Sequence, residues 1–511
     1  MNHFILSLCL GALLLSAPAY AEDLYVGQSD AGVADGTSCA NQHSAAWFNT
    51  AANWGGGAGE IDPGDTAHLC GTITSSLAAQ GSGSVGSVVT VLWETGAKLS
   101  QAVCPASPTG CFNTNGKTYL LLNGGTNGII ESTANGSVGT YANQSSSVGI
   151  MAFPCNNCEI KNLTIQNIYV HNSASDVALN DNNINAIRLS GSNTSVHHNT
   201  LHDGGRLIFH IWNNGDANID IHHNECYNNT VCWVVAATGP ASASNFNFYN
   251  NHAYNHSNWD TSGSTYHYAG VHAFGISNPT PTGYSIYNNL FEGTCGTSLT
   301  SQVYMEGGSA WTGTGTAAIY NNVMTCEVTT AIVMRADKGD ISFYNNTIIG
   351  TGIAGTCYYT GGGTLLFKNN AITGCSTLVS IDGATVANRA TDFNYNTYAC
   401  QGSFNCFNWT GLSSFERDFA TWQTACGCDP NSSQSASLLV SSVGVPTVGS
   451  PVIDTGTDLS GLGITALNSD YLGISRPSGT IWDTGAYEFV SGRASRSPAS
   501  ARTQATARTI R

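Results

Sequence analysis

Charge is scarce in this chain of 511 residues. Only 9% of the residues are Asp, Glu, Lys or Arg, against about a quarter in an ordinary soluble protein. The formal net charge is −16, and five of the sixteen basic residues lie after residue 490, so the rest of the chain carries −21. A chain this acidic is poorly suited to phosphate backbones, so we expect no nucleic-acid partner.

Long apolar runs are absent, with one exception near the N-terminus. Residues 4–16 are apolar, and Ala19-Tyr20-Ala21 follows as a small-residue cleavage motif, so residues 1–21 are predicted to be a signal peptide. The run is too short to span a bilayer and no other stretch approaches its length. We therefore expect a secreted protein, extracellular, periplasmic or on the cell surface, without a membrane span.

Cysteine, in contrast, is plentiful. Of 17 cysteines, Cys9 falls in the predicted signal peptide, and an even number remains, which predicts disulfides in an exported chain. The pairs that could close small loops are Cys104/Cys111, Cys155/Cys158, Cys226/Cys232 and Cys400/Cys406, and Cys295 and Cys326 could join neighbouring coils. Zinc is the alternative for Cys155-Asn-Asn-Cys158, but no second Cys-x-x-Cys pair would complete such a site.

A short motif recurs through the middle of the chain. It consists of an apolar residue, two aromatic or polar residues and an asparagine, as in Phe343-Tyr-Asn-Asn346. The repeated asparagines are Asn167, Asn199, Asn224, Asn251, Asn289, Asn322, Asn346, Asn370 and Asn396. Successive asparagines are 24 to 38 residues apart, and a period near 24 with insertions is typical of a solenoid.

The residues around the motif indicate the kind of solenoid. They are β-branched or aromatic and alternate in character, which is a strand pattern. Helix formers are scarce, and the 58 glycines suit short strands separated by turns. We therefore predict an all-β fold, a right-handed parallel β-helix with N- and C-terminal caps, in which the asparagines of successive coils form a hydrogen-bonded ladder.

Two N-terminal segments carry a family resemblance. Residues 61–73 contain Gly-Asp-Thr followed by Leu-Cys-Gly-Thr-Ile, and residues 88–100 end in Gly-Ala-Lys-Leu-Ser. Together they resemble the first coils of secreted right-handed β-helix proteins of the pectate-lyase-like superfamily. The resemblance implies a parallel β-helix that usually acts on polysaccharides. Lyases, hydrolases, epimerases and non-catalytic adhesins share this fold, so the resemblance selects no single activity.

The C-terminal part also resembles exported β-helix proteins, in Gly-Ser-Pro-Val-Ile-Asp-Thr-Gly (449–456) and in residues 475–488. An open solenoid end exposes unpaired strand edges and must be covered. We therefore expect one domain over 22–490, with a C-terminal cap at about 436–490 and a disordered Arg-rich tail at 491–511. The charged residues assigned to the cap rather than to chemistry are Asp454, Arg476, Asp483 and Glu488.

A candidate site follows from the strand that comes after each ladder turn. If alternate apolar residues of these strands face the core, their neighbours face solvent and align from coil to coil. The residues predicted to face outward are Arg188, His210, Trp212, Trp233, His272, Tyr304, Glu306, Arg335 and Asp337. The two longest intervals in the repeat add Trp259, His267 and Trp311 as walls for a bound sugar chain.

We predict a polysaccharide lyase, with a glycoside hydrolase as the alternative enzyme, and both have a polysaccharide as partner. In a lyase on uronate-containing glycans, His272 or Tyr304 would remove the proton next to the carboxyl group, and Arg335 would neutralise that carboxylate. Arg188 would bind a more distant sugar. In a glycoside hydrolase, Glu306 and Asp337 would act as acid and base. A non-catalytic carbohydrate-binding or adhesive protein is the third possibility.

No cofactor or metal is predicted, and we expect a monomer. The resemblance implies a calcium site in some lyases, but the sequence contains no matching acidic cluster, and the Asp-rich motif of polygalacturonase-type hydrolases is also absent. His197-His198 and His222-His223 lie before successive ladder asparagines. Stacked imidazoles could bind a metal, but other coils have Tyr or Asn at these positions, which favours a turn-surface role.

Overall fold

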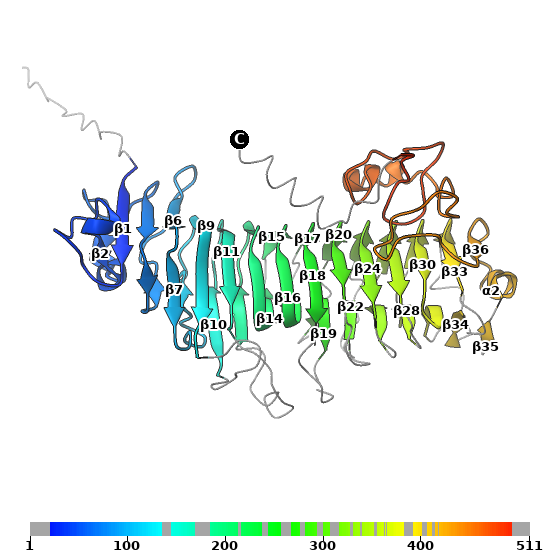
Figure 1. The fold of residues 1–511 in the computed structure, drawn as a ribbon, viewed down its shortest axis with the longest axis horizontal. Coiled ribbons are helices and arrows are strands. Elements are labelled where there is room, and N and C mark those ends of the chain that lie inside the picture. The colour runs from blue at the N-terminus through cyan, green and yellow to red at the C-terminus, as the bar shows by residue number, and fades with distance from the viewer. Residues whose placement is uncertain are drawn as a thin grey trace, which may run out of the picture.

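The chain forms one long solenoid of parallel strands in the computed structural model (Figure 1). The structure describes residues 21–134, 145–168, 184–212, 216–237, 244–256, 267–275, 282–293, 300–306, 316–327, 331–337, 340–351, 355–361, 363, 365–382, 392–400, 406–410, 414–416 and 418–492. The predicted signal peptide, the side chain of Trp212, the residues Trp259, Trp311 and Cys295, and nearly all of the Arg-rich tail lie outside this part.

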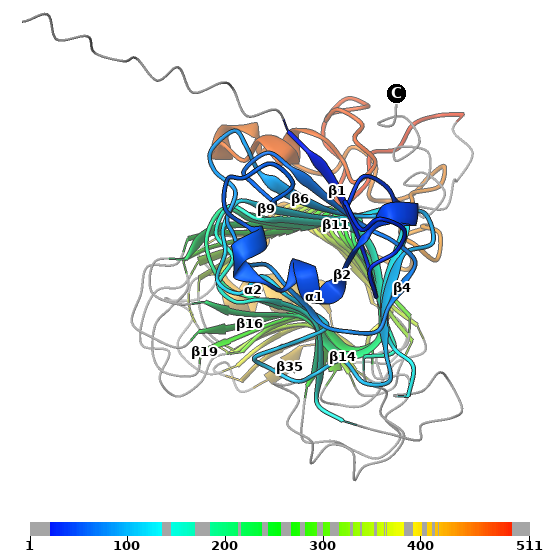
Figure 2. The ribbon, with the colours of Figure 1, turned by 90° about the vertical axis from the view of Figure 1, so that its left-hand side faces the viewer.

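Three parallel sheets surround the core, as the view along the solenoid shows (Figure 2). The first sheet contains β1 (Asp23–Gly27), β3 (Thr66–Leu69), β6 (Val89–Trp93), β9 (Leu120–Ser132), β11 (Glu159–Gln166), β13 (Thr194–His197), β15 (Ala217–His222), β17 (Ser244–Tyr249), β20 (Thr282–Tyr287), β23 (Thr316–Tyr320), β26 (Asp340–Tyr344), β29 (Leu365–Lys368) and β32 (Asp392–Asn394).

The second sheet begins after the asparagine turn of each coil. It contains β4 (Thr72–Ile73), β7 (Lys98–Gln101), the later parts of β9 and β11, the first parts of β14 (Thr200–Trp212) and β16 (Glu225–Ala237), and β18 (His252–His256), β21 (Leu290–Glu292), β24 (Val323–Cys326), β27 (Thr347–Gly350), β30 (Ala371–Thr373), β33 (Thr397–Ala399) and β36 (Ser433–Ser435).

The third sheet completes each coil and carries the candidate site. It contains β5 (Leu77–Ala78), β8 (Phe112–Asn113), β10 (Ser147–Ala152), β12 (Ile184–Leu189), the later parts of β14 and β16, and β19 (Tyr268–Gly275), β22 (Thr300–Met305), β25 (Ile332–Ala336), β28 (Thr356–Thr360), β31 (Thr377–Ile381) and β34 (Phe407–Trp409). The predicted all-β parallel solenoid is confirmed.

Short elements close the two ends. At the N-terminal end, β2 (His43–Ser44) pairs with β1 and leads into α1 (Ala45–Phe48), whose Phe48 is fully buried. At the other end, β35 (Ser414–Glu416) turns back antiparallel to β34, and α2 (Phe419–Cys426) follows. Trp422 of α2 stacks on Phe407, with ring centroids 5.0 Å apart. Figure 1 shows α2 at the end of the solenoid. Short 3-10 turns of the described residues lie at Cys39–Asn41, Ala51–Asn53, Ser460–Leu462 and Thr465–Asn468.

The predicted asparagine ladder runs through eight coils, from Asn199 to Asn396. Each asparagine accepts hydrogen bonds through its side-chain oxygen from the preceding coil and donates through its amide to the next ladder asparagine, and all are buried. Asp429 ends the ladder by accepting from Asn396 at 3.0 Å. Satisfied polar groups at one turn thus join every coil to its neighbours.

The prediction that Asn167 belongs to the asparagine ladder is wrong. The backbone N–H of Leu163 donates to Asn199 at 3.0 Å, so Leu163 occupies the ladder position of its coil. Asn167 lies four residues further along, where its φ of 54° is left-handed. Asparagine tolerates this conformation better than most residues, so Asn167 shares the composition of a turn without being part of the ladder.

The segment 436–490 covers a side of the solenoid, not its end as predicted (Figure 1). Amide groups of Asn321, Asn345 and Asn369, at the turns after β23, β26 and β29, donate to its backbone carbonyls. Tyr320 and Tyr344 pack against its apolar residues in one buried cluster with Leu459, Leu467 and Trp482. The helix α2 and its neighbours already lie at the C-terminal end of the solenoid. The segment 436–490 instead covers the side of the first sheet that carries Tyr320 and Tyr344.

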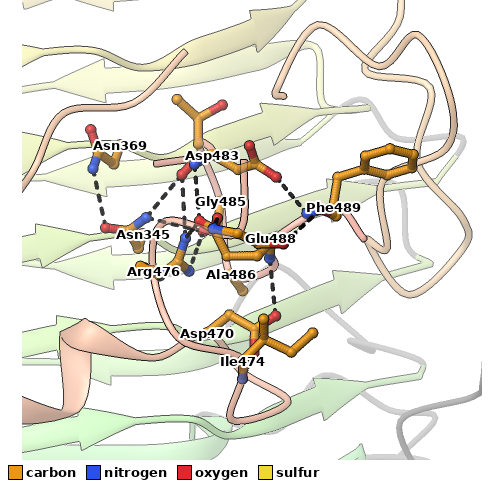
Figure 3. Close-up of polar contacts among 12 residues, drawn as sticks. Asn345, Asn369, Asp470, Ile474, Arg476, Asp483, Gly485, Ala486, Glu488 and Phe489 are labelled. Atoms are coloured by element: carbon orange, nitrogen blue, oxygen red, sulfur yellow. Dashed lines mark hydrogen bonds and ion pairs between the residues drawn. The ribbon is translucent and has the colours of Figure 1, made fainter. Parts of the chain in front are cut away.

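A buried ion pair holds this flanking segment together (Figure 3). Arg476 and Glu488 lie 2.6 Å apart with both side chains fully buried. Arg476 also donates to the carbonyl of Gly485 at 3.0 Å and to Asn321 at 3.3 Å. Burial raises the pKa of the nearby Asp483 to about 6. These contacts support the structural role that the sequence suggested for these charges.

Disulfides reinforce the coils. The four predicted loop pairs, Cys104–Cys111, Cys155–Cys158, Cys226–Cys232 and Cys400–Cys406, are all present. The Cys155–Cys158 bond removes zinc as an alternative there. The structure adds Cys39–Cys70, Cys357–Cys375 and Cys426–Cys428. Cys326 is also disulfide-bonded.

Among the described residues, no helix is long and apolar enough to cross a membrane.

Candidate functional site

Two adjacent columns of side chains run along the outer face of the third sheet. In the first, His272, Tyr304, Arg335 and Tyr359 are direct partners on successive coils, and we call it the aromatic column. In the second, Glu306, Asp337 and Gly361 follow two residues after Tyr304, Arg335 and Tyr359, and Asp382 follows on the next coil. Each of the four donates its backbone N–H to the coil before. We call this the acidic column. The neighbours between and before them, such as Val303 and Met305, are buried in the core, so the columns face outward.

The register differs from the expected one by two residues at one position. Sequence reasoning aligned Glu306 with His272 and Arg335. In the structure, Tyr304 lies between those two, and Glu306 aligns with Asp337 instead. The residues lie on the predicted coils, but the carboxylates form a column of their own.

His272 and Glu306 form the first pair across the columns. The Nε2 of His272 lies 2.8 Å from the Oε2 of Glu306, and the imidazole stacks on the Tyr304 ring at 4.9 Å with an interplanar angle of 7°. His267 contacts both rings edge-on, at 5.4 and 4.6 Å. Only 4% of His272 is exposed, against 34% of the Glu306 side chain. The carboxylate is therefore the accessible member of this pair.

Asp337 is the most strongly bound carboxylate of the site. It accepts from the Nε of Arg335 at 2.8 Å, from the Nη2 at 3.3 Å and from the hydroxyl of Tyr304 at 2.7 Å. The guanidinium also lies over the Tyr304 ring, 4.7 Å from its centroid. A bidentate arginine together with a phenol fixes the orientation of a carboxylate. Asp337 is thus held in one position.

Asp382 is a carboxylate that sequence reasoning missed. It accepts from the hydroxyls of Thr410 at 2.7 Å and Tyr359 at 3.2 Å and is exposed. Gly361 separates it from Asp337 in the acidic column, and a side chain there would meet the Asp337 carbonyl oxygen at 2.6 Å. Two carboxylates thus flank a position without a side chain. Extending the strand series by one coil, to Ile381-Asp382, would have found it.

Burial and hydrogen bonds set the protonation of these groups. Burial lowers the pKa of His272 to about 4, although Glu306 opposes the shift, and the hydrogen bond from His272 lowers the pKa of Glu306. Burial and the contact with Asp337 raise the pKa of Tyr304. At neutral pH His272 is a neutral ring, Glu306 an anion and Tyr304 a protonated phenol.

An apolar patch continues the aromatic column toward the N-terminus. Arg188 aligns with Phe209, which aligns with Val234 and then with His272. The Arg188 guanidinium lies 5.3 Å from the Phe209 ring centroid, and that of Arg206 lies 5.5 Å from the same ring. Arg188 therefore faces outward as predicted, on the far side of a patch from the carboxylates.

Two predicted binding residues belong to the core. His210 is fully buried and touches Phe246 edge-on at 4.9 Å. Trp233 is fully buried and stacks on Phe248 at 5.3 Å. The prediction that both face outward is wrong. The outward-facing residues of these strands, Phe209 and Val234, are themselves apolar. The alternation of polar and apolar residues therefore assigned the inward and outward positions the wrong way round.

Within the described residues, one group of three or more side chains converges closely enough for a metal ion, and it lies on the first sheet at His197, His198 and His222. The carboxylates of the acidic column do not form such a group.

No family model matches the chain, and no curated protein is similar to it in sequence. Among solved structures, the complex of XylC with xylose covers 92% of this chain and 98% of its own, with a TM-score of 0.52 and 10% identity. The chain is a right-handed parallel β-helix protein. PfbA, a surface adhesin of Streptococcus pneumoniae, has a TM-score of 0.43 at 14% identity and covers 68% of this chain and 83% of its own. A polygalacturonase from Erwinia carotovora ssp. carotovora has a TM-score of 0.39 at 11% identity, covering 78% and 97%. At these identities the likeness concerns the fold alone.

Proposed function

We propose that this protein is an exported glycoside hydrolase that cleaves a neutral polysaccharide with the carboxylates of the acidic column. The observation that carries the proposal is the contrast in access across the site. Glu306, Asp337 and Asp382 present carboxylates at the surface of three of four successive coils, while His272 and Tyr304 are 4% and 2% exposed. A group must reach the substrate to transfer a proton.

The same geometry disfavours the lyase, which was the activity favoured on sequence grounds. The Nε2 of His272 is occupied by Glu306, and its Nδ1 is buried. A tyrosine base needs a lowered pKa, but that of Tyr304 is raised. Arg335 is already neutralised by Asp337, so a uronate carboxylate would compete with an existing ion pair. Each role in the β-elimination thus lacks a free, suitable group among these residues.

The roles of acid and base follow from the surroundings of each carboxylate. Asp337 is anchored by Arg335 and Tyr304, and we assign it the role of general base. The hydrogen bond from His272 lowers the pKa of Glu306, which makes Glu306 a poor proton donor, and we assign the role of general acid to Asp382, the remaining carboxylate of the acidic column. Asp337 and Asp382 are two coil steps apart, about 10 Å at the backbone, so side chains that lean toward each other would reach the separation of about 6.5–9.5 Å between the carboxyl groups of inverting enzymes. Gly361 leaves the space between them for water and the scissile bond.

Electrostatics favour a neutral substrate. The net charge of the chain is −16. The two columns contain three carboxylates, Glu306, Asp337 and Asp382, and one arginine, Arg335, which is already paired with Asp337. A polyuronate would bring further negative charge to this surface. Export is supported by the described disulfides, which persist in oxidising compartments.

The test is hydrolysis of a panel of neutral and uronate polysaccharides, followed by reducing-end release and by ultraviolet absorbance of the unsaturated product of elimination. We expect reducing ends without absorbance, and about 10²–10⁴-fold less activity in Asp337→Asn and in Asp382→Asn. Glu292→Gln, an acidic residue of the second sheet, is the matched control. NMR of the first product should show inversion at the anomeric carbon.

Other outcomes would redirect the assignment. Retention of configuration, with activity lost in Glu306→Gln, would assign the reaction to Glu306 and Asp337, one coil step or about 5 Å apart. Absorbance that disappears in Arg335→Ala would establish the lyase. Binding of a glycan without any product, in a folded protein, would establish a non-catalytic carbohydrate-binding role.

A further inference from the structure

Four histidines form a compact cluster on the first sheet, on a different face from the acidic column. His197 at the end of β13 is the direct partner of His222 at the end of β15, and His198 and His223 follow them at the turn. The rings stack in two layers: His197 on His222 at 4.7 Å and 5°, and His198 on His223 at 4.9 Å and 2°.

Hydrogen bonds orient all the Nδ1 atoms of the cluster toward its centre. The Nδ1 atoms of His197 and His198 are 2.7 Å apart, and those of His222 and His223 are 2.8 Å apart. Two imidazole nitrogens at this distance share a single proton, so one nitrogen of each pair donates it and the other accepts it through its lone pair. A metal ion would take the place of this proton, which the donor ring can carry on its Nε2 instead.

Contacts outside the cluster fix which nitrogen of His197 and of His222 faces inward. The Nε2 of His197 lies 2.9 Å from Glu159, which Lys161 also contacts at 2.6 Å. The Nε2 of His222 lies 3.2 Å from the Ser195 hydroxyl. Metal-binding histidines in proteins have their other ring nitrogen held in this way by a carboxylate or another polar group.

The fold itself does not require histidine at these positions. His198 and His223 have left-handed φ values of 55° and 54°, and the corresponding residues of later coils are asparagines with the same conformation, such as Asn288 at 53°. The preceding position is tyrosine in those coils, for example Tyr287. The turn therefore forms equally well without imidazoles.

We propose that His197, His198 and His222 bind a divalent transition-metal ion that prefers imidazole ligands, with Zn²⁺ as the reference case. Their ligand atoms all lie within 4.8 Å of one another. Two nitrogens of a tetrahedral zinc site are about 3.4 Å apart, so ring movements of about 1 Å bring these atoms into place. His223, whose Nδ1 faces that of His222, offers a fourth nitrogen. This site is independent of the proposed hydrolysis.

The ion would join two successive coils at their surface. We assign it no step in the reaction, because the cluster and the acidic column lie on different sheets. Sequence reasoning gave these histidines to the turn surface, since it could not show that both Nε2 atoms are occupied and both Nδ1 pairs converge.

The test is calorimetric titration of the chelator-treated full-length protein with Zn²⁺ alone. We expect one ion per chain, and at least tenfold weaker binding in the double variant His198→Asn/His223→Asn. Asparagine is the residue of the equivalent turns, so the left-handed backbone is retained. His252→Asn, on the second sheet, is the control and should bind as the wild type does. With Co²⁺ as probe, the wild type should show the absorption of a tetrahedral nitrogen site.

A second variant separates metal binding from folding. Glu159→Gln keeps all four imidazoles and should weaken Zn²⁺ binding about 10–100-fold by loosening the orientation of His197. Unsaturable Zn²⁺ uptake by the wild type, or equal affinity in the wild type and the double asparagine variant, would overturn the proposal. Thermal unfolding in chelator must be the same for the wild type and Glu159→Gln for the comparison to count in its favour.

Discussion

The asparagine ladder makes a sharp prediction about stability at its central position, Asn289. Its amide donates to the carbonyl of Phe248 at 2.8 Å and to Asn322 at 3.0 Å, and its oxygen accepts from the backbone N–H and the amide of Asn251 at 2.9 and 3.2 Å. The residue is fully buried. Each such bond contributes about 1 kcal/mol net, and a buried donor left without a partner costs about 1–3 kcal/mol. We expect Asn289→Ala to lose about 4 kcal/mol of unfolding free energy.

A second asparagine ladder, exposed to solvent, supplies the control. Asn193 donates to Asn157, Asn218 to Asn193, and Asn245 to Asn218, at 2.9 to 3.1 Å. Water can replace these bonds, so Asn218→Gly should cost less than about 1 kcal/mol. Glycine is chosen because Asn218 has a φ of 58°, which alanine would adopt only with strain.

The assay is urea denaturation followed by circular dichroism, with the free energy taken from the midpoint and slope. Asn289→Ala should shift the midpoint down several times further than Asn218→Gly does. A loss below about 1.5 kcal/mol for Asn289→Ala, or equal losses in the two variants, would refute the view that buried side-chain hydrogen bonds hold the coils together.

Three further predictions concern stability. Arg476→Met leaves Glu488 charged and buried without its partner, so it should cost about 3–5 kcal/mol and make the flanking segment 436–490 sensitive to limited proteolysis; an unchanged digestion pattern would contradict this. His256 is fully buried with its pKa lowered to about 3, so its contribution is present above pH 6.5 and is lost as pH falls toward 3; His256→Gln should remove on the order of 2 kcal/mol of the difference in urea stability between pH 7 and pH 5. The stability contribution of Asp483 has the opposite pH dependence, because its pKa of about 6 lies above its ordinary value. This contribution is present below pH 3.8 and is lost as pH rises through 6. Asp483→Asn should therefore be stabilised relative to the wild type more at pH 7 than at pH 4, and an equal stability difference at the two pH values would rule this out.

The sequence was sufficient for the repeat because one interaction recurs at one position. Each ladder asparagine needs its neighbours, so the period survives the insertions between Asn251 and Asn322. The same regularity placed His272, Tyr304 and Arg335 on successive coils. The expected monomer and signal peptide remain predictions.

The direction of side chains was harder to predict where the outer face is also apolar. Phe209 and Val234 face outward and pack in a cluster with Val231, Ala236 and Ala269, so β14 and β16 read as apolar on both faces. The strands also turn a corner at Asp203 and Asn228, whose φ values are 50°. A left-handed residue within a strand resets the alternation, and the pattern beyond it cannot be counted from the residues before it.

The position of the segment 436–490 on the flank constrains the order in which the chain can fold. Its partners, Tyr320 and Tyr344, belong to coils that are synthesised more than a hundred residues before Leu467 and Trp482. A nascent or truncated chain ending near residue 435 would contain every coil strand and yet display an uncovered aromatic stripe, the kind of surface that promotes self-association. The segment 436–490 would then act as an intramolecular shield, and we expect a chain that lacks it to self-associate more than the full-length protein does.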